Sequence, residues 1–396
     1  MKRSKHTLYL TRKLKLQKTE QLDKLALASG DLYTRTLVSF WRTRNKKNIW
    51  LSQYGMEKWH MSDQLHAHTS DAIVGCFYDA LASWKEARKI NPEARPPRRR
   101  KRYYKIVWKN SAIKIKDGVI RLSNGRGNDF LYIPWRWGEP NKVEIGWDGD
   151  QYELRASYGC ESTSIPIGNR VAGIDLGEVH IAASHDGTNT YLINGRELRS
   201  KKRYLNKTKA KLQSKIDKKK RGSRRRGQLI KSKRKQTKRL NNQVRDILHK
   251  QTTHLVSTLY NDGVDTVVIG DLRNVRINND CGRKNNQKIH QMHSGESRQM
   301  ITYKSKKLGM KVEMQDEYYT SKDCPRCGHR NDPKGRNYIC EKCNFIYHRD
   351  GVGSINIRKK YLGSSPVVGV MASPIGLRYK PNKKVCKLNQ CSSKAS

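Results

Sequence analysis

The chain has 396 residues, and its 83 Lys and Arg residues outnumber its 35 Asp and Glu residues, which gives a formal net charge of +48. So large an excess predicts a polyanionic partner, with binding that weakens steeply as salt rises. No uninterrupted apolar run approaches the ~20 residues that span a bilayer, and the charged start of the chain lacks a signal-peptide core. We therefore expect two or three domains of a soluble intracellular protein without a membrane partner.

The first 102 residues change from strand-like to helix-like spacing and end in a basic segment. Residues 7–17 alternate between apolar and polar side chains, which predicts a strand, and residues 19–89 carry apolar side chains at helical spacing. Asn91-Pro92 ends that helical domain. The segment that follows contains Arg98, Arg99 and Arg100, and it is a linker or a phosphate-facing segment.

Residues 103–165 read as β structure. Asp117-Gly118 and Asp148-Gly149 lie between strand-like runs, and such pairs are typical of tight hairpins because both turn residues need positive φ. All eight tryptophans precede residue 150. Two interpretations stay open for them: they fill the cores of two small domains, or some stack on the bases of a bound strand.

The next segment predicts three short strands at 171–175, 180–184 and 191–193, followed by a long helical stretch from Arg196 to about Tyr260. Half of residues 201–240 are Lys or Arg, and Asp217 is the only acid among them. A solvated helix normally interleaves acids with its bases, so we expect phosphates to neutralise this one. The predicted nucleic-acid contacts are Arg98, Arg99, Arg100, Lys218, Lys219, Lys220, Arg221, Arg224, Arg225, Arg226 and Arg326.

The remaining elements are a buried strand at 266–269, an Asn-rich loop at 274–287, a helix at 297–308, a strand at 311–315 and a helix from Val352 to Tyr361. Strand, strand, strand, helix, strand, helix, strand is the order of an RNase H-like nuclease domain. After Gly363 the chain is rich in Ser, Pro, Gly and Lys, which predicts a flexible tail.

Four cysteines carry the most specific spacing in the chain, C-x2-C-x12-C-x2-C. Two such knuckles wrap one tetrahedral Zn²⁺ with four thiolates and leave no open position, so we expect a structural zinc. The five other cysteines are scattered, as reduced thiols are. The predicted zinc ligands are Cys324, Cys327, Cys340 and Cys343.

Two isolated carboxylates have the placement that a nuclease requires. Asp175 ends an apolar strand, where a carboxylate is costly unless a cation or donors compensate it. Asp350 begins the last helix directly after the cysteines, and by itself it is equally consistent with a helix N-cap. In the RNase H-like fold such carboxylates, with a third, hold two Mg²⁺ ions that act on a phosphodiester.

Three motifs together resemble the TnpB family of transposon-encoded RNA-guided nucleases, relatives of the compact type V CRISPR effectors and of the Fanzor proteins. They are Gly-Ile-Asp-Leu-Gly at 173–177, Tyr-Thr-Ser-Lys-Asp-Cys-Pro-Arg-Cys-Gly at 319–328 and His-Arg-Asp-Gly-Val-Gly-Ser-Ile-Asn-Ile at 348–357. The resemblance spans about 95–361, because Arg98–Leu122 also resembles the family's wedge domain.

One position departs from the family pattern. The family's middle catalytic Glu ends the fourth strand, where this chain has Gly270. Three explanations compete: Asp271 substitutes although its side chain faces the other side of the strand, the nuclease is inactive, or the carboxylate has moved to Glu317. We favour Glu317, as in branches resembling Fanzor, with Asp316 as its immediate rival.

The resemblance implies a multi-domain α+β protein with a RuvC-like nuclease domain, an inserted four-cysteine zinc ribbon, a β-barrel-like wedge domain and a helical recognition domain. The expected ranges are 1–18 (first wedge strand), 19–92 (helical recognition domain), 93–165 (wedge β domain), 166–319 (nuclease domain, with a basic insertion at 196–260), 320–346 (ribbon), 347–362 (last nuclease helix) and 363–396 (tail).

The function implied is RNA-guided DNA cleavage next to a short recognised motif, with Asp175, Glu317 and Asp350 as Mg²⁺ ligands. Guide RNA and target DNA are the implied partners of a monomeric protein, which would be cytoplasmic in a prokaryote or nuclear in a eukaryote. A nuclease-inactive RNA-guided DNA binder is the alternative, and a guide-free, structure-specific nuclease is a third candidate.

Overall fold

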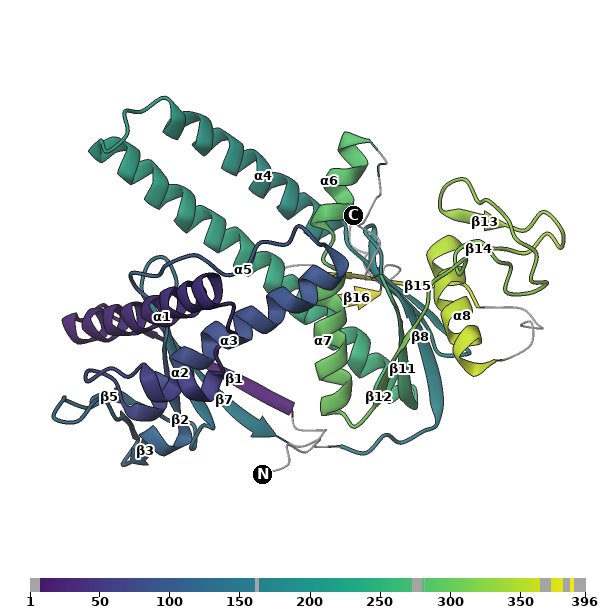
Figure 1. Cartoon of the computed structure of the whole chain (residues 1–396). Coiled ribbons are helices and arrows are strands. Elements are labelled where there is room, and N and C mark those ends of the chain that lie inside the picture. Colours follow the sequence, from purple (N-terminus) through teal and green to yellow (C-terminus); the bar gives the residue numbers. More distant parts are fainter. Residues whose placement is uncertain are drawn as a thin grey trace, which may run out of the picture. The chain divides into compact units, whose positions relative to one another are not determined.

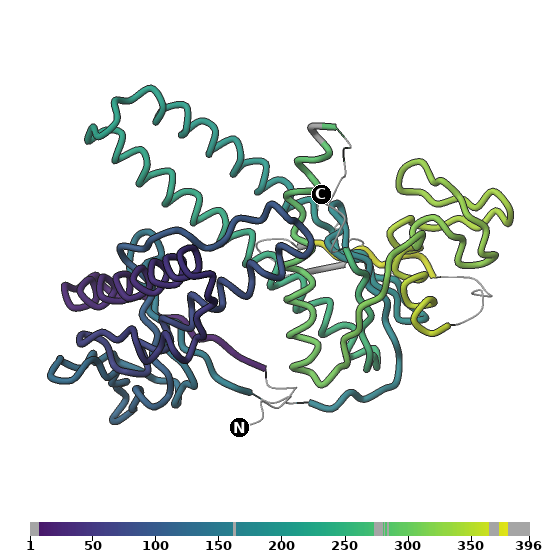
Figure 2. The backbone as a smooth tube through the Cα atoms, viewed as in Figure 1, coloured from purple at the N-terminus to yellow at the C-terminus, as the bar shows by residue number. Residues whose placement is uncertain are grey.

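The computed structural model describes residues 8–160, 164–272, 280, 282–363, 372–379 and 385–387. The chain divides between residues 160 and 161 into two compact units, each with its own hydrophobic core (Figures 1 and 2). No helix within those described ranges is both long and apolar enough to cross a bilayer.

The N-terminal unit contains two antiparallel sheets. Its four-stranded sheet has the order β1 (Leu8–Leu16), β7 (Tyr152–Cys160), β6 (Lys142–Trp147), β2 (Ile106–Lys109), and its three-stranded sheet consists of β3 (Ile113–Lys116), β4 (Val119–Leu122) and β5 (Leu131–Pro134), with a 3-10 turn at Asn110–Ala112. The predicted hairpin between β3 and β4 is confirmed, with φ of 49° at Asp117 and 72° at Gly118. The first strand therefore pairs with the last strand of the unit, from the far end of its sequence.

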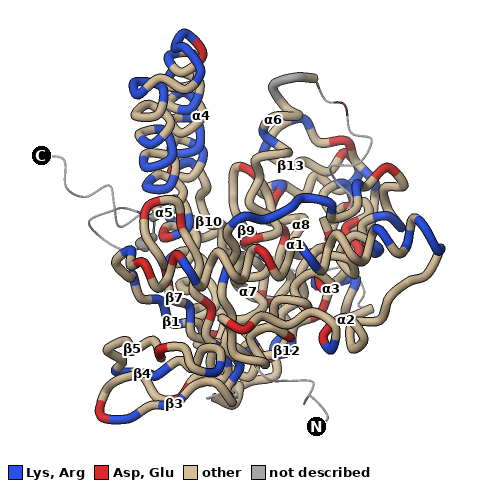
Figure 3. The backbone as a smooth tube through the Cα atoms, turned by 60° about the vertical axis from the view of Figure 1, so that its left-hand side comes forward, with Lys and Arg blue, Asp and Glu red and all other residues tan. Residues whose placement is uncertain are grey.

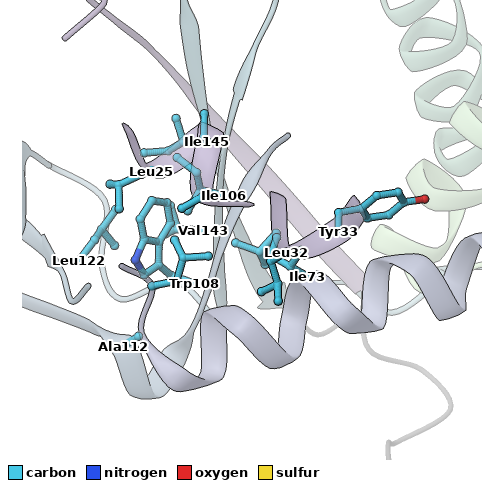
Figure 4. Close-up of a cluster of buried hydrophobic side chains, with 14 of the residues drawn as sticks. Leu25, Leu32, Tyr33, Ile73, Ile106, Trp108, Ala112, Leu122, Val143 and Ile145 are labelled. Carbon is cyan, nitrogen blue, oxygen red and sulfur yellow. The ribbon is translucent and has the colours of Figure 1, made fainter. Parts of the chain in front are cut away.

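Three helices cover this β structure: α1 (Glu20–Lys47), α2 (Gln53–Trp59) and α3 (Ala67–Ile90). Thr19 caps α1, where its side chain accepts a hydrogen bond from the backbone N–H of Leu22 at 3.2 Å. Helix side chains such as Leu25, Leu32 and Ile73 share one core with Trp108 and Ile145 of the strands (Figure 4).

The tryptophans divide between the two interpretations that the sequence left open. Trp108 and Trp135 are buried, and the indole N–H of Trp108 donates to the Ser123 carbonyl oxygen at 2.9 Å. Trp50, Trp59 and Trp147 instead expose between 44 and 64% of their surface. Core packing therefore accounts for only part of the tryptophan content of this unit.

The C-terminal unit is built on a seven-stranded sheet. Its strand order is β12 (Lys311–Gln315), β11 (Val264–Gly270), β8 (Arg170–Asp175), β9 (His180–His185), β10 (Thr190–Asn194), β15 (Ile375–Tyr379), β16 (Val385–Lys387). β8 pairs antiparallel with β9 and parallel with β11. Helices α5 (Arg224–Asn261) and α7 (Ser294–Lys307) lie on one side of the sheet, and α8 (Arg349–Leu362) packs on the other (Figure 1).

The basic stretch predicted as one helix is a helical hairpin. Helix α4 (Arg196–Asp217) ends before a turn at 218–223, and α5 returns alongside it (Figure 1). Gly222 in the turn has a φ of 83°, which favours glycine. Arg226 closes the turn, because its guanidinium donates to the carbonyl oxygens of Ile216 and Lys219.

Two predictions after β11 need correction. The segment expected to be an Asn-rich loop includes helix α6 (Arg283–Gln291), while residues 273–279 and Cys281 lie outside the described residues. The flexible tail expected from residue 363 includes β15, which runs parallel to β10, and β16. The physical reason is visible at Leu377, whose side chain is 2% exposed and packs into the core of the unit.

Candidate metal centre

Asp175 and the helix α8 meet at the centre of the sheet. Asp175 is the last residue of β8, and Gly353 of α8 lies so close that any Cβ at residue 353 would collide with the Asp175 carboxylate. Gly173 makes room in the same way, since a Cβ there would meet the backbone of Ser354 and Arg358. These glycines let the first turn of α8, which carries Asp350, approach the end of β8.

Glu317 occupies the space that Gly270 leaves open. Strands β11 and β12 pair in parallel with Gly270 opposite Gln315, and Glu317 follows two residues later. A Cβ built on Gly270 would collide with the carboxyl group of Glu317. Gly270 of β11 has no side chain, and the Glu317 side chain, which follows the end of β12, fills the space beside it.

The two rival acids lie differently. Asp271 is within 3.7 Å of the Arg298 guanidinium, and Asp316 is exposed. Asp271 is nevertheless near enough to add to the repulsion that Glu317 experiences. Glu317 is the acid that fills the position beside Gly270.

The carboxyls of Asp175 and Glu317 are hard to ionise. Burial, with repulsion from Asp350, raises the pKa of Asp175 to about 7. Burial, with repulsion from Asp175 and then Asp271, raises the pKa of Glu317 to about 8. Glu317 Oε1 is buried and, among the described residues, has no hydrogen-bond partner. Carboxyl groups whose ionisation is this costly offer oxygen ligands that fit a divalent cation such as Mg²⁺.

Asp350 has the opposite environment. His180 Nδ1 lies 2.7 Å from its Oδ2, and Arg336 Nη1 lies 2.7 and 2.8 Å from its two oxygens. Burial opposes ionisation, but the hydrogen bond from His180 and the charge of Arg336 lower the pKa of Asp350 below its usual value. An ionised carboxylate only accepts hydrogen bonds, so His180 donates from Nδ1.

The N-cap of α8 is His348 rather than Asp350. His348 Nδ1 accepts a hydrogen bond from the backbone N–H of Asp350 at 3.2 Å. The imidazole rings of His348 and His180 pack edge to face with their centroids 5.0 Å apart. One ligand atom from each of His180, His348 and Asp350 lies within 4.8 Å of the others. The backbone N–H of Asp350 is therefore capped by His348, and the Asp350 side chain does not serve as the N-cap.

The sequence interpretation missed His180 and Arg336. They lie 170 and 14 residues from Asp350 in the chain, and neither has a spacing that marks it as a partner. Their only signal is position: His180 follows Asp175 by five residues, and Arg336 lies inside the cysteine-rich segment.

The four cysteines converge as their spacing predicts. Cys324 Sγ and Cys343 Sγ lie 3.6 Å apart, and Cys327 Sγ and Cys340 Sγ lie 3.5 Å apart. All four sulfur atoms are within 4.8 Å of one another. A Zn–S length of ~2.3 Å in a tetrahedron sets sulfur atoms ~3.8 Å apart, so the site fits a Zn²⁺ ion. The short hairpin of β13 (Asn337–Ile339) and β14 (Ile346–His348) carries two of the cysteines on its loop and leads directly into α8.

The predicted phosphate-binding residues belong to three different segments of the chain. Arg98, Arg99 and Arg100 belong to the N-terminal unit, Arg326 to the cysteine-rich segment, and the others to the turn and the start of α5. All except Arg226 are exposed, and Lys and Arg line the two antiparallel helices (Figure 3). Arg226 binds the turn carbonyls instead.

Comparison with known proteins matches two family models. Residues 152–276 match a probable transposase family, OrfB of IS605, and residues 295–357 match the TNB domain of Cas12f1-like proteins. The first range contains Asp175, and the second contains Glu317, the four cysteines and Asp350.

Two curated relatives are TnpB-like proteins. One, from Methanocaldococcus jannaschii, is 34% identical over 133 residues, which cover 33% of this chain and 46% of the relative. The other, from Acidianus two-tailed virus, is 27% identical over 308 residues, which cover 71% of this chain and 64% of the relative. The chain thus spans about half to two thirds of the length of these relatives.

Solved structures share the fold. A Cas12f1 in complex with a single guide RNA and target DNA matches with a TM-score of 0.59 and 14% identity, over 85% of this chain and 81% of that one. A mini-RNA-guided endonuclease, Cas-phi3, matches with a TM-score of 0.50 and 11% identity, over 93% of this chain and 94% of that one. The predicted multi-domain α+β fold is confirmed, and parts of the chain are similar in sequence to TnpB-like proteins and to the two family models.

Proposed function

We propose that the protein is an RNA-guided DNA endonuclease with a single nuclease centre formed by Asp175, Glu317 and Asp350. The sequence similarity to TnpB-like proteins and the fold shared with a Cas12f1 support the general activity. The observation that carries the assignment of the centre is the position of Glu317, whose buried carboxyl fills the space beside Gly270 next to Asp175.

The residues of the chain divide the work at this centre. Asp175, Glu317 and Asp350 would hold two Mg²⁺ ions, which when bound supply charge that activates water and stabilises the leaving oxygen of a phosphodiester. His180 holds Asp350 Oδ2 in one orientation. Arg336 donates hydrogen bonds to both oxygens of Asp350, so this guanidinium would have to release at least one of them for Asp350 to hold a cation.

The remaining parts bind nucleic acid. A guide RNA pairs with the target strand, so the protein needs mainly backbone contacts, and its charge of +48 supplies them. The N-terminal unit recognises a short motif beside the target, and one protein copy binds one guide. The four cysteines would hold a structural Zn²⁺.

A direct test uses the protein purified with its co-expressed guide RNA and a plasmid that carries the matching target. We expect Mg²⁺-dependent cleavage by the wild type. Glu317→Ala should lower cleavage at least about a thousandfold, the equivalent of ~4 kcal/mol of transition-state stabilisation, and should leave guide and target binding unchanged.

Asp271→Ala is the matched control, because Asp271 is the neighbouring acid that the proposal leaves outside the centre. It should retain most of the cleavage. Normal cleavage by Glu317→Ala together with loss in Asp271→Ala would assign the middle carboxylate to Asp271.

A second candidate is an RNA-guided DNA-binding protein that does not cut. The observation that favours it is the pair of Arg336 contacts, which already neutralise Asp350. Tight, guide-dependent target binding by the wild type without any cleavage in Mg²⁺ or Mn²⁺ would select this candidate.

A further inference from the structure

The N-terminal unit contains a pocket of about 600 Å³ that the proposed nuclease centre does not use. Three segments line it: the start of α1, residues 101–105, and the hairpin of β6 and β7. All of them belong to one unit with one core, so the pocket is a feature of that unit alone.

Aromatic rings form a large part of the pocket wall. Tyr103 and Trp147 both line it and expose 50 and 48% of their surface. Tyr152 is buried beneath, with its ring 5.1 Å from that of Trp147 at an interplanar angle of 77°. Tyr152 thus packs against Trp147, whose surface is still 48% exposed. Half-exposed aromatic rings on a pocket wall mark a binding surface for another flat apolar group.

Positive charge lies beside these rings. Lys101, Lys105 and Arg155 line the same pocket. Lys105 and Arg155 are each paired with a glutamate, at 3.1 and 2.7 Å. Within the described part of the chain, no acid lies at ion-pair distance from Lys101, whose ammonium lies 5.9 Å from the Tyr104 ring.

Asp23 of α1 lines the pocket on the side of that helix. Asp23 of α1 accepts a hydrogen bond from the Tyr152 hydroxyl at 2.8 Å and pairs with Lys18 at 2.9 Å. Its negative charge is thus already compensated, so it does not repel an anion at the open side. The pocket therefore combines stacking surface with an available cation, which is the chemistry that recognises a base and its phosphate.

We propose that this pocket binds one unpaired nucleobase of a nucleic-acid strand, with the base between Tyr103 and Trp147 and the adjacent phosphate at Lys101. A duplex offers no unstacked base, so the site selects a single-stranded or flipped-out nucleotide. This inference goes beyond the proposed cleavage activity and holds whether or not the protein cuts DNA.

The test measures binding by the full-length protein freed of copurified RNA. The probes are short oligonucleotides with one 2-aminopurine, as single-stranded RNA, single-stranded DNA and duplex DNA. Stacking on an aromatic ring quenches 2-aminopurine fluorescence, and each stacked base is worth ~1–3 kcal/mol. The double variant Tyr103→Ala/Trp147→Ala should therefore weaken single-strand binding about tenfold or more and abolish the quenching.

Three further variants isolate the pocket. Trp147→Phe keeps a ring and should retain binding within a few fold. Lys101→Ala should weaken binding of every single strand and reduce the salt dependence by about one phosphate contact. Trp59→Ala is the matched control, because Trp59 is 64% exposed in the same unit but does not line the pocket; it should change nothing.

Comparison of the single-stranded RNA and single-stranded DNA probes shows whether the bound base comes from RNA or from DNA. Unchanged quenching in the double variant, an equal loss in Trp59→Ala, or an equal loss of duplex binding would each overturn the proposal. Thermal unfolding of every variant separates loss of the pocket from loss of the fold.

Discussion

The two sides of the proposed nuclease centre contain the same kind of group in opposite states. On one side His180 and Arg336 hold the carboxylate of Asp350 ionised. On the other side burial is the main cause that raises the pKa of Asp175 to about 7 and that of Glu317 to about 8, and the charge of Asp175 adds to the shift of Glu317. The difference teaches that neighbours, rather than residue type, decide which acid the protein neutralises itself and which acids require a cation.

This asymmetry assigns different tasks to the two sides. The Asp350 side is ordered before any cation binds, because three side chains already fix its geometry. For Asp175 and Glu317, a bound cation would be the partner that stabilises the ionised carboxylates. Changes on the two sides should therefore differ in sign as well as in size.

The largest expected effect comes from moving the middle carboxylate back to β11. Gly270 lies in an ordinary strand without positive φ, so the Glu317 side chain is what stands in the way of a larger residue. Gly270→Glu/Glu317→Ala should recover cleavage to within about tenfold of the wild type, whereas Glu317→Ala alone loses at least about a thousandfold.

Plasmid cleavage at saturating guide checks this exchange. Gly270→Glu alone is the control, since two carboxyls cannot share one space, and it should unfold at a lower temperature than the double variant. A double variant as inactive as Glu317→Ala would show that the two positions do not serve one centre.

Substitution of His180, which supports Asp350, should have a smaller effect on cation binding. Its Nδ1 donates to Asp350, and the amide nitrogen of Asn takes the place of Nδ1, whereas that of Gln takes the place of Nε2. Loss of such a supporting contact typically lowers metal affinity 10–100-fold. His180→Gln should show that loss, and His180→Asn should stay close to the wild type.

Mn²⁺ binding by electron paramagnetic resonance, together with the Mg²⁺ concentration for half-maximal cleavage, measures the His180 effect. Equal losses in the Asn and Gln variants would reject a role through Nδ1. A merely structural role would change the unfolding temperature of the variants without shifting the cation concentration.

The smallest expected effects are on the stability of the metal-free protein, where Glu317→Gln and Asp350→Asn should change the unfolding temperature in opposite directions. The native pKa of Glu317 is raised from 4.5 to about 8, so the native state binds more protons than the unfolded chain between these values. Stability therefore falls as pH rises through that window. Glu317→Gln should raise the unfolding temperature by a few degrees at pH 8 and by little at pH 5.

Asp350→Asn is the counterpart on the other side. The native pKa of Asp350 is lowered, so its contribution to stability is present above its unfolded value and is lost only as the pH falls through its native pKa. This variant should lower the unfolding temperature at both pH 5 and pH 8. Scanning calorimetry with a chelator checks both variants, and shifts of the same sign at pH 8 would refute the asymmetry.

Local sequence patterns predicted the strands and the cysteine cluster on which the proposed metal ligands lie. Asp175 ends a strand that apolar spacing predicts, the cysteines converge as their spacing requires, and Glu317 follows the strand that pairs with β11. Glu317 is favoured because the resemblance places a Glu at the position of Gly270, and the structure puts the Glu317 carboxyl in the space beside Gly270.

Contacts between distant segments were beyond reach of local pattern. His180 and Arg336 are ordinary polar residues in the chain, and only the packing of α8 against β9 and against the β13–β14 hairpin makes them partners of Asp350. The break between α4 and α5 was missed because the uniform basic composition hides the turn at Gly222. Strand β15 was missed because it is only five residues long and lies in a segment rich in Ser, Pro and Gly.

Strand β15 bears on any effort to make the protein smaller. A chain cut at Gly363 would keep every proposed metal ligand, yet it would leave the backbone of β10 without the neighbour with which Tyr191 to Ile193 pair. An uncovered strand of this kind recruits strands from other molecules. Miniaturised versions that end after the last helix should therefore self-associate, even though their chemistry is intact.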